Sequence, residues 1–173
     1  MSNGKTVLLT GASGVVGSAL VPELIEAGFR VIALVRSRGI DDARVIEVKG
    51  DIALTDFGID LFALAGAYGP IDCVIHSAAI TSFGQPETAI RSANVTGTQH
   101  AVEVARRLGA RLIYVSTAYT HDLKLPPYLK EYSAYCESKR EAEAYIKQNA
   151  RNWTIVRPSI VVGESATGQI SQF

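Results

Sequence analysis

The chain has 173 residues, enough for one domain with a sizeable core, and 47% of them are hydrophobic. Charged residues make up 20%, with 17 basic and 17 acidic side chains, so the composition shows neither disorder nor the basic excess of a nucleic-acid-binding protein. No apolar run reaches the roughly 20 residues of a membrane span, and no signal-peptide pattern opens the sequence. We therefore expect a cytoplasmic protein in which Cys73 and Cys136 are buried thiols.

Short apolar runs rich in β-branched residues predict strands, since glycines, charged residues or helical patterns bound each of them. In chain order these runs are residues 5–10, 29–36, 43–51, 71–79, 110–117 and 153–159. The link between the second and third runs leaves room for a single helical turn at most.

Apolar positions at helical spacing predict helices between these strands. They cover residues 15–28, 54–67, 86–109 and 133–149, and glycines weaken the second helix at Gly58 and the third near Gly97. Alternating strands and helices predict an α/β domain over residues 1–173, with a doubly wound parallel sheet of about six strands covered on both faces. Ligands of such sheets bind at the carboxyl ends of the strands.

The stretch TGASGVVG, residues 10–17, lies where the first strand meets the first helix. Gly11 allows a sharp turn, Gly14 allows a phosphate to approach the helix N-terminus, and Gly17 allows the helix to pack close to the sheet. Free N–H groups and the positive end of the helix dipole suit a pyrophosphate there. The strand–turn–helix order therefore favours a dinucleotide site over a tight turn without a ligand.

The second strand ends in VRSRG, at a position where sites that prefer NAD usually carry an acidic residue. This chain has Arg36 there, followed by Ser37 and Arg38, and a guanidinium can pair with a 2′-phosphate. We therefore expect NADP in preference to NAD. At the end of the third strand, Asp51 is either an acceptor for the adenine amino group or an ordinary turn aspartate.

YCESK places Tyr135 and Lys139 four residues apart, on one face of the last predicted helix. A phenol titrates at about pH 10, and a nearby ammonium favours the phenolate, so we expect Lys139 to lower the pKa of Tyr135. Upstream, Ser116 and Thr117 end the fifth strand, and the alternation of side chains lets only one of their hydroxyls face the site. Together these residues predict an acid–base site.

These motifs together resemble the short-chain dehydrogenase/reductase family, particularly its extended and atypical members, over essentially the whole chain. The glycine turn has the family's TGxxGxxG spacing. Further motifs follow in the family's order: HSAA (76–79), NVTGT (94–98), YVST (114–117), YCESK (135–139) and RPSIVVGES (157–165). The resemblance implies a Rossmann fold, and the wording of the motifs is similar to reductases that act on fatty-acyl and carrier-bound thioesters.

The resemblance also implies roles for individual residues. Thr117 is implied to orient the substrate oxygen, Tyr135 to be the acid/base and Lys139 to bind the nicotinamide ribose. Asn94 is implied to be a structural or proton-relay residue. The residues implied to bind the cofactor are Gly11, Ala12, Ser13, Gly14, Val15, Val16, Gly17, Arg36, Asp51, Ile52, Ser77, Ala78, Ala79, Tyr135, Lys139, Pro158 and Ser159.

Extended members of the family continue well beyond GESATGQISQF, where this sequence stops. The resemblance therefore implies that this chain carries the cofactor half and the dyad, without most of the substrate-binding region. The leading hypothesis is hydride transfer between a nicotinamide and a carbonyl or alcohol carbon of a small molecule. The alternatives are an epimerase or dehydratase acting on a nucleotide sugar, and a nucleotide-binding sensor without catalysis.

The remaining features suggest structure more than chemistry. The histidines show no ligand spacing, so we expect no metal, and we expect His76 to be a satisfied core histidine. KREAEAYIK, residues 139–147, is most simply a solvated helix face. The resemblance further implies that the two long helices, 86–109 and 133–149, could pair two copies of the chain as a homodimer.

Overall fold

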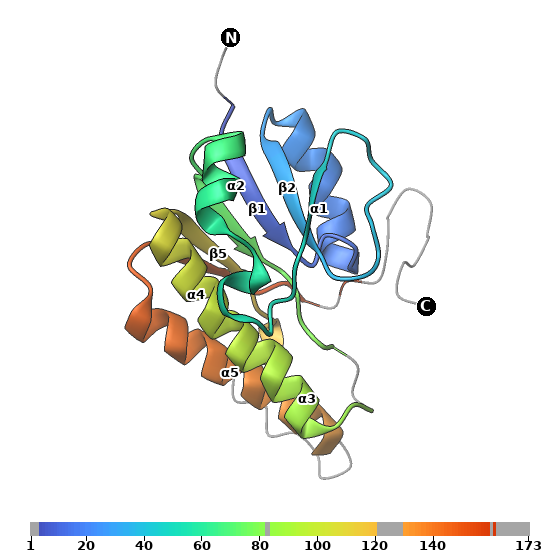
Figure 1. The fold of residues 1–173 in the computed structure, drawn as a ribbon. Helices are drawn as coiled ribbons and strands as arrows, with labels where there is room; N and C mark the ends of the chain where they lie inside the picture. The colour runs from blue at the N-terminus through green and yellow to red at the C-terminus, as the bar shows by residue number, and fades with distance from the viewer. Residues whose placement is uncertain (1–3, 82–83, 121–129, 160, 162–173) are drawn as a thin grey trace.

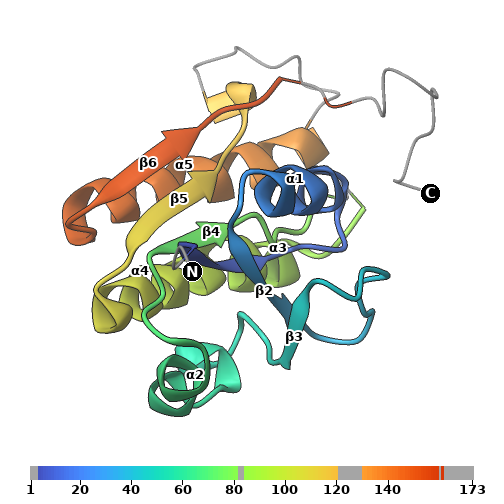
Figure 2. The same cartoon turned by 90° about the horizontal axis from the view of Figure 1, so that it is seen from above.

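A parallel sheet forms the centre of the protein. The computed structural model describes residues 4–81, 84–120, 130–159 and 161, with the backbone alone for 130–133. Within these residues six strands are hydrogen-bonded in the order β3-β2-β1-β4-β5-β6 (Figures 1 and 2). The strands are β1 (Thr6–Thr10), β2 (Arg30–Val35), β3 (Ile46–Lys49), β4 (Cys73–His76), β5 (Arg111–Val115) and β6 (Trp153–Val156). Every predicted strand is confirmed, and each is shorter than its apolar run.

The strand order places a topological switch point beside β1. Thr10, the last residue of β1, pairs with Leu34 of β2 on one side and with His76 of β4 on the other. The chain therefore winds outward in both directions from β1. In such a sheet the crevice beyond the carboxyl ends of the two central strands is where ligands bind.

Helices cover the two faces of the sheet unequally. The helices are α1 (Val15–Glu26), α2 (Leu61–Tyr68), α3 (Glu87–Arg91), α4 (Gly97–Leu108) and α5 (Lys130–Asn149). The short helical turns are η1 (Thr55–Gly58), η2 (Ser92–Thr96) and η3 (Ala118–Thr120). One core cluster joins α2, α4 and α5 to one face through Leu64, Ala105 and Ile146, and the other joins α1 to the opposite face through Val21.

Two predicted helices are broken in the structure. The helix expected over 54–67 is wrong in its first part, because Asp56 and Phe57 adopt positive φ angles of 53° and 59°. Asp60 then caps α2 by accepting hydrogen bonds from the backbone N–H groups of Phe62 and Ala63, both at 2.9 Å. The helix expected over 86–109 contains a π-helical turn, η2, immediately before Gly97, where the sequence had indicated a weakness.

The link between β2 and β3 holds no helix, as its length predicted. The cysteines are free thiols, but only Cys136 is buried; Cys73, at the start of β4, is half-buried, so the expectation for it is wrong. Within the described residues, no helix is long and apolar enough to cross a membrane.

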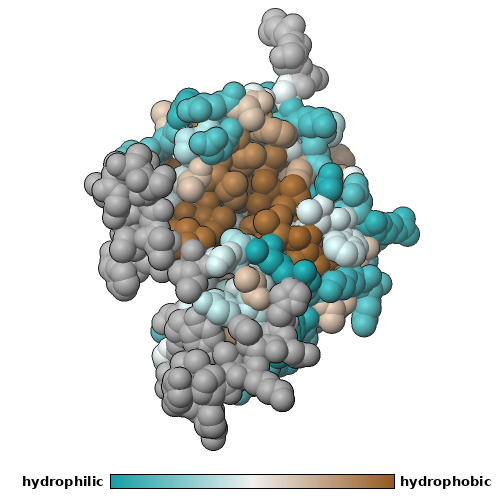
Figure 3. All heavy atoms as spheres, turned by 180° about the vertical axis from the view of Figure 1, so that it is seen from behind, coloured by the Kyte–Doolittle hydropathy of each residue, from teal (hydrophilic) through white to brown (hydrophobic). Residues whose placement is uncertain are grey.

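Among the described residues, the face of the sheet that carries α1 is only partly covered by helices. Ile113 and Val115 of β5 point to this side and are only partly buried, and Val156 of β6 is exposed. Figure 3 turns this side to the viewer and shows apolar side chains gathered in its middle. Over β5 and β6, helix cover is therefore denser on the α5 side.

Replacing Gly17 by alanine tests the close packing of α1 on the turn before it. A Cβ atom there would lie 2.7 Å from Ala12 Cα and closer still to the carbonyl oxygen of Gly11, both backbone atoms. We expect Gly17→Ala to lower the free energy of unfolding by about 1–3 kcal/mol in urea denaturation. Gly66→Ala in α2, where a Cβ meets nothing within 4 Å, is the control and should raise it by up to about 1 kcal/mol. Equal stability of the two variants would contradict the packing argument.

Candidate functional site

The glycine turn leaves the N-terminus of α1 open to an anion. Gly11 has a φ of +73°, and a Cβ on it would lie 2.6 Å from the backbone nitrogen of Ala78. Gly14 caps α1 through its backbone, and the helix start has no side-chain cap and no acidic residue in its first turn. Among the described residues, the start of α1 therefore has no side chain that caps or neutralises it, as an anion site requires.

A cavity of about 500 Å³ opens at the carboxyl ends of β1, β2, β3 and β4. It brings together more than half of the predicted cofactor residues, from the glycine turn, the end of β2, the end of β3 and the segment after β4. Those that line it are Gly11, Ser13, Gly14, Arg36, Asp51, Ile52, Ser77, Ala78 and Ala79. A single elongated ligand can reach all of these segments at the switch point.

Other predicted cofactor residues lie outside the lining of this cavity. Ala12 and Gly17 are buried beneath the turn, and Val15 and Val16 begin α1 behind it. Pro158 and Ser159, with Tyr135 and Lys139, lie on the β5–β6 side of the site and do not line it.

One wall of the cavity consists of residues that the sequence motifs did not indicate. Ala89 of α3 and Ser92 and Ala93 of η2 line it, together with Ile80 after β4. Their small side chains were the available signal, but nothing in the sequence placed α3 opposite the glycine turn.

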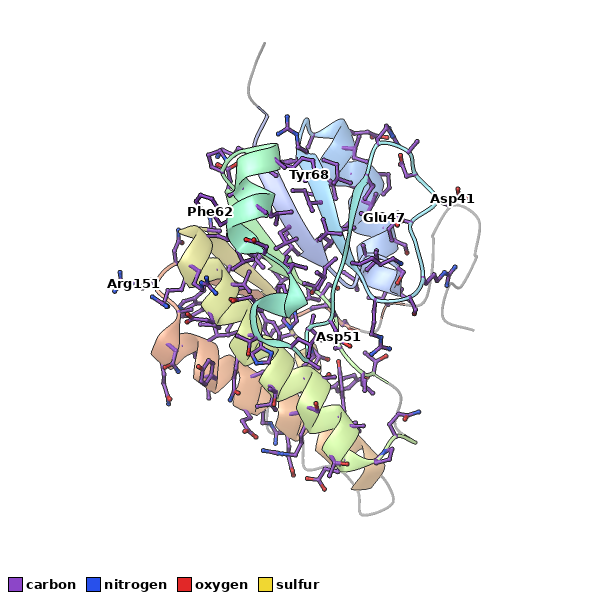
Figure 4. All side chains as sticks on the ribbon, viewed as in Figure 1. Asp41, Glu47, Asp51, Phe62, Tyr68 and Arg151 are labelled. Carbon is purple, nitrogen blue, oxygen red and sulfur yellow. The ribbon has the colours of Figure 1, made fainter. Side chains whose placement is uncertain are left out.

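Arg36 and Asp51 face each other across the cavity mouth. The closest guanidinium and carboxylate atoms are 4.0 Å apart, and the Arg36 side chain is 77% exposed. Asp51, labelled in Figure 4, uses Oδ1 to accept a hydrogen bond of 2.9 Å from the N–H of Ala53. Arg36 is therefore only loosely paired and can turn toward a ligand, while Asp51 is partly engaged in its own turn.

Asn94 ties the cavity wall to α5. Its side chain accepts a hydrogen bond from the N–H of Ile80 at 2.8 Å and donates to the Ile80 carbonyl at 3.0 Å. Its amide also donates to Ser138 Oγ at 3.0 Å. These contacts join the segment after β4 to α5, and the choice between a structural and a proton-relay role for Asn94 stays a prediction.

The two hydroxyls at the end of β5 point in different directions. Ser116 Oγ donates to a carboxylate oxygen of Glu143 at 2.6 Å, away from the cavity. The Thr117 side chain lies close enough to the phenol of Tyr135 of α5 to lower its pKa. Of the pair left open by the sequence, Thr117 is thus the one beside the phenol.

Lys139 lies deeply buried one helical turn after Tyr135. It is 2% exposed, donates from Nζ to the carbonyl oxygen of Val115 at 2.9 Å, and lies 4.6 Å from the centre of the Tyr114 ring. Burial lowers the pKa of Lys139 to about 7, against the attraction of the Glu143 carboxylate. This ammonium is therefore poised between its charged and neutral forms near neutral pH.

The pKa of Tyr135 is shifted in the direction opposite to the one expected. Tyr135 is 9% exposed, and this burial raises its pKa, while the nearby Thr117 side chain lowers it less. Withdrawal from water disfavours the phenolate more than the local partners favour it. At neutral pH Tyr135 accordingly carries its proton in this structure.

The segment KREAEAYIK is not a solvated face, so that interpretation is wrong. Lys139, Ala142, Glu143 and Ile146 are all buried against the sheet. Burial raises the pKa of Glu143, but hydrogen bonds from Arg157 and Ser116 and the charges of Arg157 and Lys147 outweigh it and lower the pKa to about 2. This charged segment therefore contains a buried carboxylate, that of Glu143, which its sequence pattern did not indicate.

His76 is only half satisfied as a core histidine. Its Nδ1 and the Thr10 hydroxyl are 2.8 Å apart, and its ring stacks on Tyr114 with centroids separated by 5.9 Å. Its Nε2 atom is buried without a hydrogen-bond partner among the described residues. Burial lowers the pKa of His76 to about 3, and the charge of Lys139 lowers it further. His76 is therefore neutral at pH 7.

Comparisons with known proteins agree with this architecture. An NAD-binding family model described as "Male sterility protein" matches residues 39–173. The chain is 32% identical over 171 residues to the spore coat polysaccharide biosynthesis protein SpsK of Bacillus subtilis, covering 93% of this chain and 55% of SpsK. It is 26% identical over 216 residues to the L-2-aminoadipate reductase of Schizosaccharomyces pombe, covering 96% of this chain and 15% of that protein. The chain thus spans little more than half of one relative and a small part of the other.

Solved structures show the same fold. The terminal R domain of the myxalamid PKS-NRPS biosynthetic pathway aligns with a TM-score of 0.76 and 30% identity, covering 93% of this chain and 50% of that one. WbmH of Bordetella bronchiseptica, solved in complex with NAD+, aligns with a TM-score of 0.71 and 24% identity, covering 88% of this chain and 55% of that one. At 24% identity the second likeness concerns the fold alone.

Lys139→Met tests the burial of the ammonium. With a pKa of about 7 in the folded protein and 10.5 for the ordinary side chain, the folded state binds fewer protons than the unfolded chain between these pH values. Stability therefore rises with pH across this window in the wild type, and the variant should lack that part of the rise. Urea denaturation at several pH values measures it, with Lys49→Met, which removes an exposed lysine, as control. If the free energy of unfolding changed with pH in the same way in the wild type and in Lys139→Met, the burial of a titrating lysine would be contradicted.

Proposed function

The chain belongs to the male sterility protein family of NAD-binding proteins, within the extended short-chain dehydrogenases/reductases, and from its site we propose that it transfers a hydride between a nicotinamide cofactor and a carbonyl or alcohol carbon. The observation that carries the proposal is that the Thr117 side chain lies close enough to the Tyr135 phenol to lower its pKa, with Lys139 one helical turn away on α5. These groups lie at the same edge of the sheet as the dinucleotide-sized cavity.

The cavity fits a dinucleotide in two respects. The turn at Gly11 leaves no room for a Cβ beside Ala78, so the backbone there can form a close cradle for a pyrophosphate. The uncapped N-terminus of α1 supplies N–H donors and the positive end of a helix dipole. Gly11, Ser13, Gly14 and Ala78 are the residues that we assign to the pyrophosphate side of the cofactor.

When bound, the nicotinamide supplies or accepts the hydride, and the protein handles the proton. Tyr135 keeps its proton at neutral pH because burial raises its pKa, and this is the form that can donate to the oxygen of a carbonyl. Thr117 can hold the same oxygen through its hydroxyl. The reductive direction is therefore the one that this arrangement favours.

Lys139 can stabilise the phenolate that Tyr135 becomes after it has donated its proton. Its ammonium is one turn from the phenol and buried, so its charge acts at close range in a medium of low dielectric constant. A phenolate formed on Tyr135 would then be favoured over the same phenolate without a neighbouring charge. We also assign the nicotinamide ribose to Lys139, following the resemblance to the family.

We further propose NADP as the preferred cofactor. Arg36 lines the cavity at the end of β2, together with Ser37 and Arg38, and its contact with Asp51 is loose at 4.0 Å. A guanidinium in this place can bind a 2′-phosphate with charge-assisted hydrogen bonds.

An epimerase or dehydratase acting on a nucleotide sugar is the second candidate. It is favoured by the 32% identity to SpsK, whose name assigns it to the biosynthesis of a spore coat polysaccharide. Such an enzyme returns the hydride to its substrate, so it would consume no cofactor overall. Net oxidation of NADPH by aldehydes, ketones or thioesters supports the reductase, whereas tight binding without turnover of any substrate supports a sensor.

Tyr135→Phe should abolish turnover and leave cofactor binding unchanged. Removal of one general acid typically costs about 10²–10⁴-fold in rate, and the ring that fills the core is kept. Steady-state cofactor oxidation and calorimetric titration with NADPH measure the two effects. Tyr145→Phe on the same helix is the matched control and should keep the wild-type rate. Full activity of Tyr135→Phe would exclude the assigned role.

Arg36→Ala should weaken NADPH binding while leaving NADH binding nearly unchanged. A lost charged hydrogen bond is worth about 1.5–3 kcal/mol, or roughly 10- to 100-fold in the dissociation constant. Arg30→Ala is the control at the opposite end of the same strand, where Arg30 binds the carbonyl oxygen of Tyr68. Equal losses for both cofactors would show that Arg36 does not read the 2′-phosphate.

A further inference from the structure

Three successive residues at the end of β5 each face one residue of α5. Lys139 Nζ donates to the Val115 carbonyl at 2.9 Å, and the next residue, Ser116, donates to Glu143 Oε1 at 2.6 Å. The third residue, Thr117, lies close enough to Tyr135 to lower the pKa of its phenol. The three groups on α5 are spaced four residues apart, so they share one face of the helix.

Glu143 also binds the end of the neighbouring strand. Arg157, the first residue after β6, donates to both carboxylate oxygens, from Nε at 2.8 Å and from Nη2 at 2.6 Å. The two strand ends are joined through the backbone as well, since Ser116 N–H donates to the Val156 carbonyl at 2.8 Å and Ala118 N–H to the Pro158 carbonyl at 3.0 Å. One carboxylate thus holds both strand ends that flank Thr117.

The charges around Lys139 also point to Glu143. His76 of β4 is neutral at pH 7, and Tyr114 of β5 and Tyr135 of α5 both have pKa values raised by burial, so they are neutral as well. Glu143 is 4% exposed and ionised, on the turn of α5 after Lys139, and it forms ion pairs with Arg157 at 2.6 Å and Lys147 at 3.5 Å. Among the described groups packed around the ammonium, Glu143 therefore carries the negative charge.

A purely structural role explains this arrangement less well. Buried ion pairs contribute little net stability, because withdrawing both charges from water offsets much of their attraction. Here the Glu143 carboxylate does more than pair with a cation. It holds Ser116, the residue before Thr117, and it lies on the same face of α5 as Tyr135 and Lys139.

We propose that Glu143 is a positioning residue of the hydride-transfer site: it locks the end of β5 against α5 so that Thr117 meets Tyr135, and it is the counter-charge of the Lys139 ammonium. This inference rests on the proposed function for its kinetic consequence. Its electrostatic consequence can be measured without any turnover.

Glu143→Gln is the test variant, because the amide keeps the size of the side chain and can still accept from Ser116 while the charge is lost. Glu141→Gln is the matched control: Glu141 lies on the same helix, exposed, and pairs with Arg91. Thermal unfolding of both variants checks that they are folded. Ser116→Ala removes the hydroxyl contact alone and serves where Glu143→Gln folds poorly.

The decisive readout is the titration of Lys139 by NMR in protein labelled at the lysine ε-carbon. The signal is assigned by its loss in Lys139→Met. We expect the midpoint to fall by about one pH unit or more in Glu143→Gln and to stay unchanged in Glu141→Gln. An unchanged midpoint in Glu143→Gln would overturn the proposal, whatever the activity of the variant.

The kinetic readout separates positioning from binding. We expect kcat of Glu143→Gln to fall about tenfold or more at neutral pH, with the NADPH dissociation constant within about twofold of wild type. Glu143→Asp keeps the charge and should restore the Lys139 midpoint while recovering kcat only in part. A wild-type kcat in Glu143→Gln would overturn the positioning role. If no form of the protein turns over any substrate, the proposed function fails, and the NMR titration still decides the role of Glu143.

Discussion

The contacts between α5 and the end of β5 set the geometry on which the rest of the site depends. Tyr135, Lys139 and Glu143 project from one helix face onto three successive residues of the strand. Because a helix is stiff over two turns, the three contacts depend on each other. A displacement of α5 at one of the three residues also displaces the other two. Asn94 extends the same frame to the cavity wall, since it binds both Ile80 and Ser138 of α5. These hydrogen bonds thereby connect the nucleotide side of the site to its proton-transfer side.

This frame places ionised groups where water cannot solvate them. Lys139 meets a carbonyl oxygen and the face of the Tyr114 ring, and Glu143 meets a hydroxyl and a two-pronged guanidinium from Arg157. The two pKa shifts differ because the partners differ. Burial dominates at Lys139, whereas hydrogen bonds and opposite charges outweigh burial at Glu143. A protein gains little stability from such groups, so their presence beside Tyr135 is more readily explained by chemistry.

The sequence predicted what local pattern determines. Buried β-branched runs identified every strand, and helical spacing placed Tyr135 and Lys139 on one face, because both depend on neighbours in the chain. The sequence did not predict features that depend on contacts between segments far apart in the chain. The acidic residue Glu143 is typical of an exposed helix face until Ser116 and Arg157, 27 and 14 positions away, are brought to it by the sheet. In the same way, no local signal showed that burial would raise the pKa of Tyr135.

The regular spacing on α5 also limits how this stretch can change in evolution. An α-helix turns by about 100° for each residue, so one inserted or deleted residue between Tyr135 and Glu143 would swing the later groups away from the strand. Exchanges at the outward positions, such as Glu137 and Glu141, leave the register intact. This segment should therefore tolerate many substitutions at its exposed sites and no change in length, whereas the link between β2 and β3, which holds no helix, is free of that constraint.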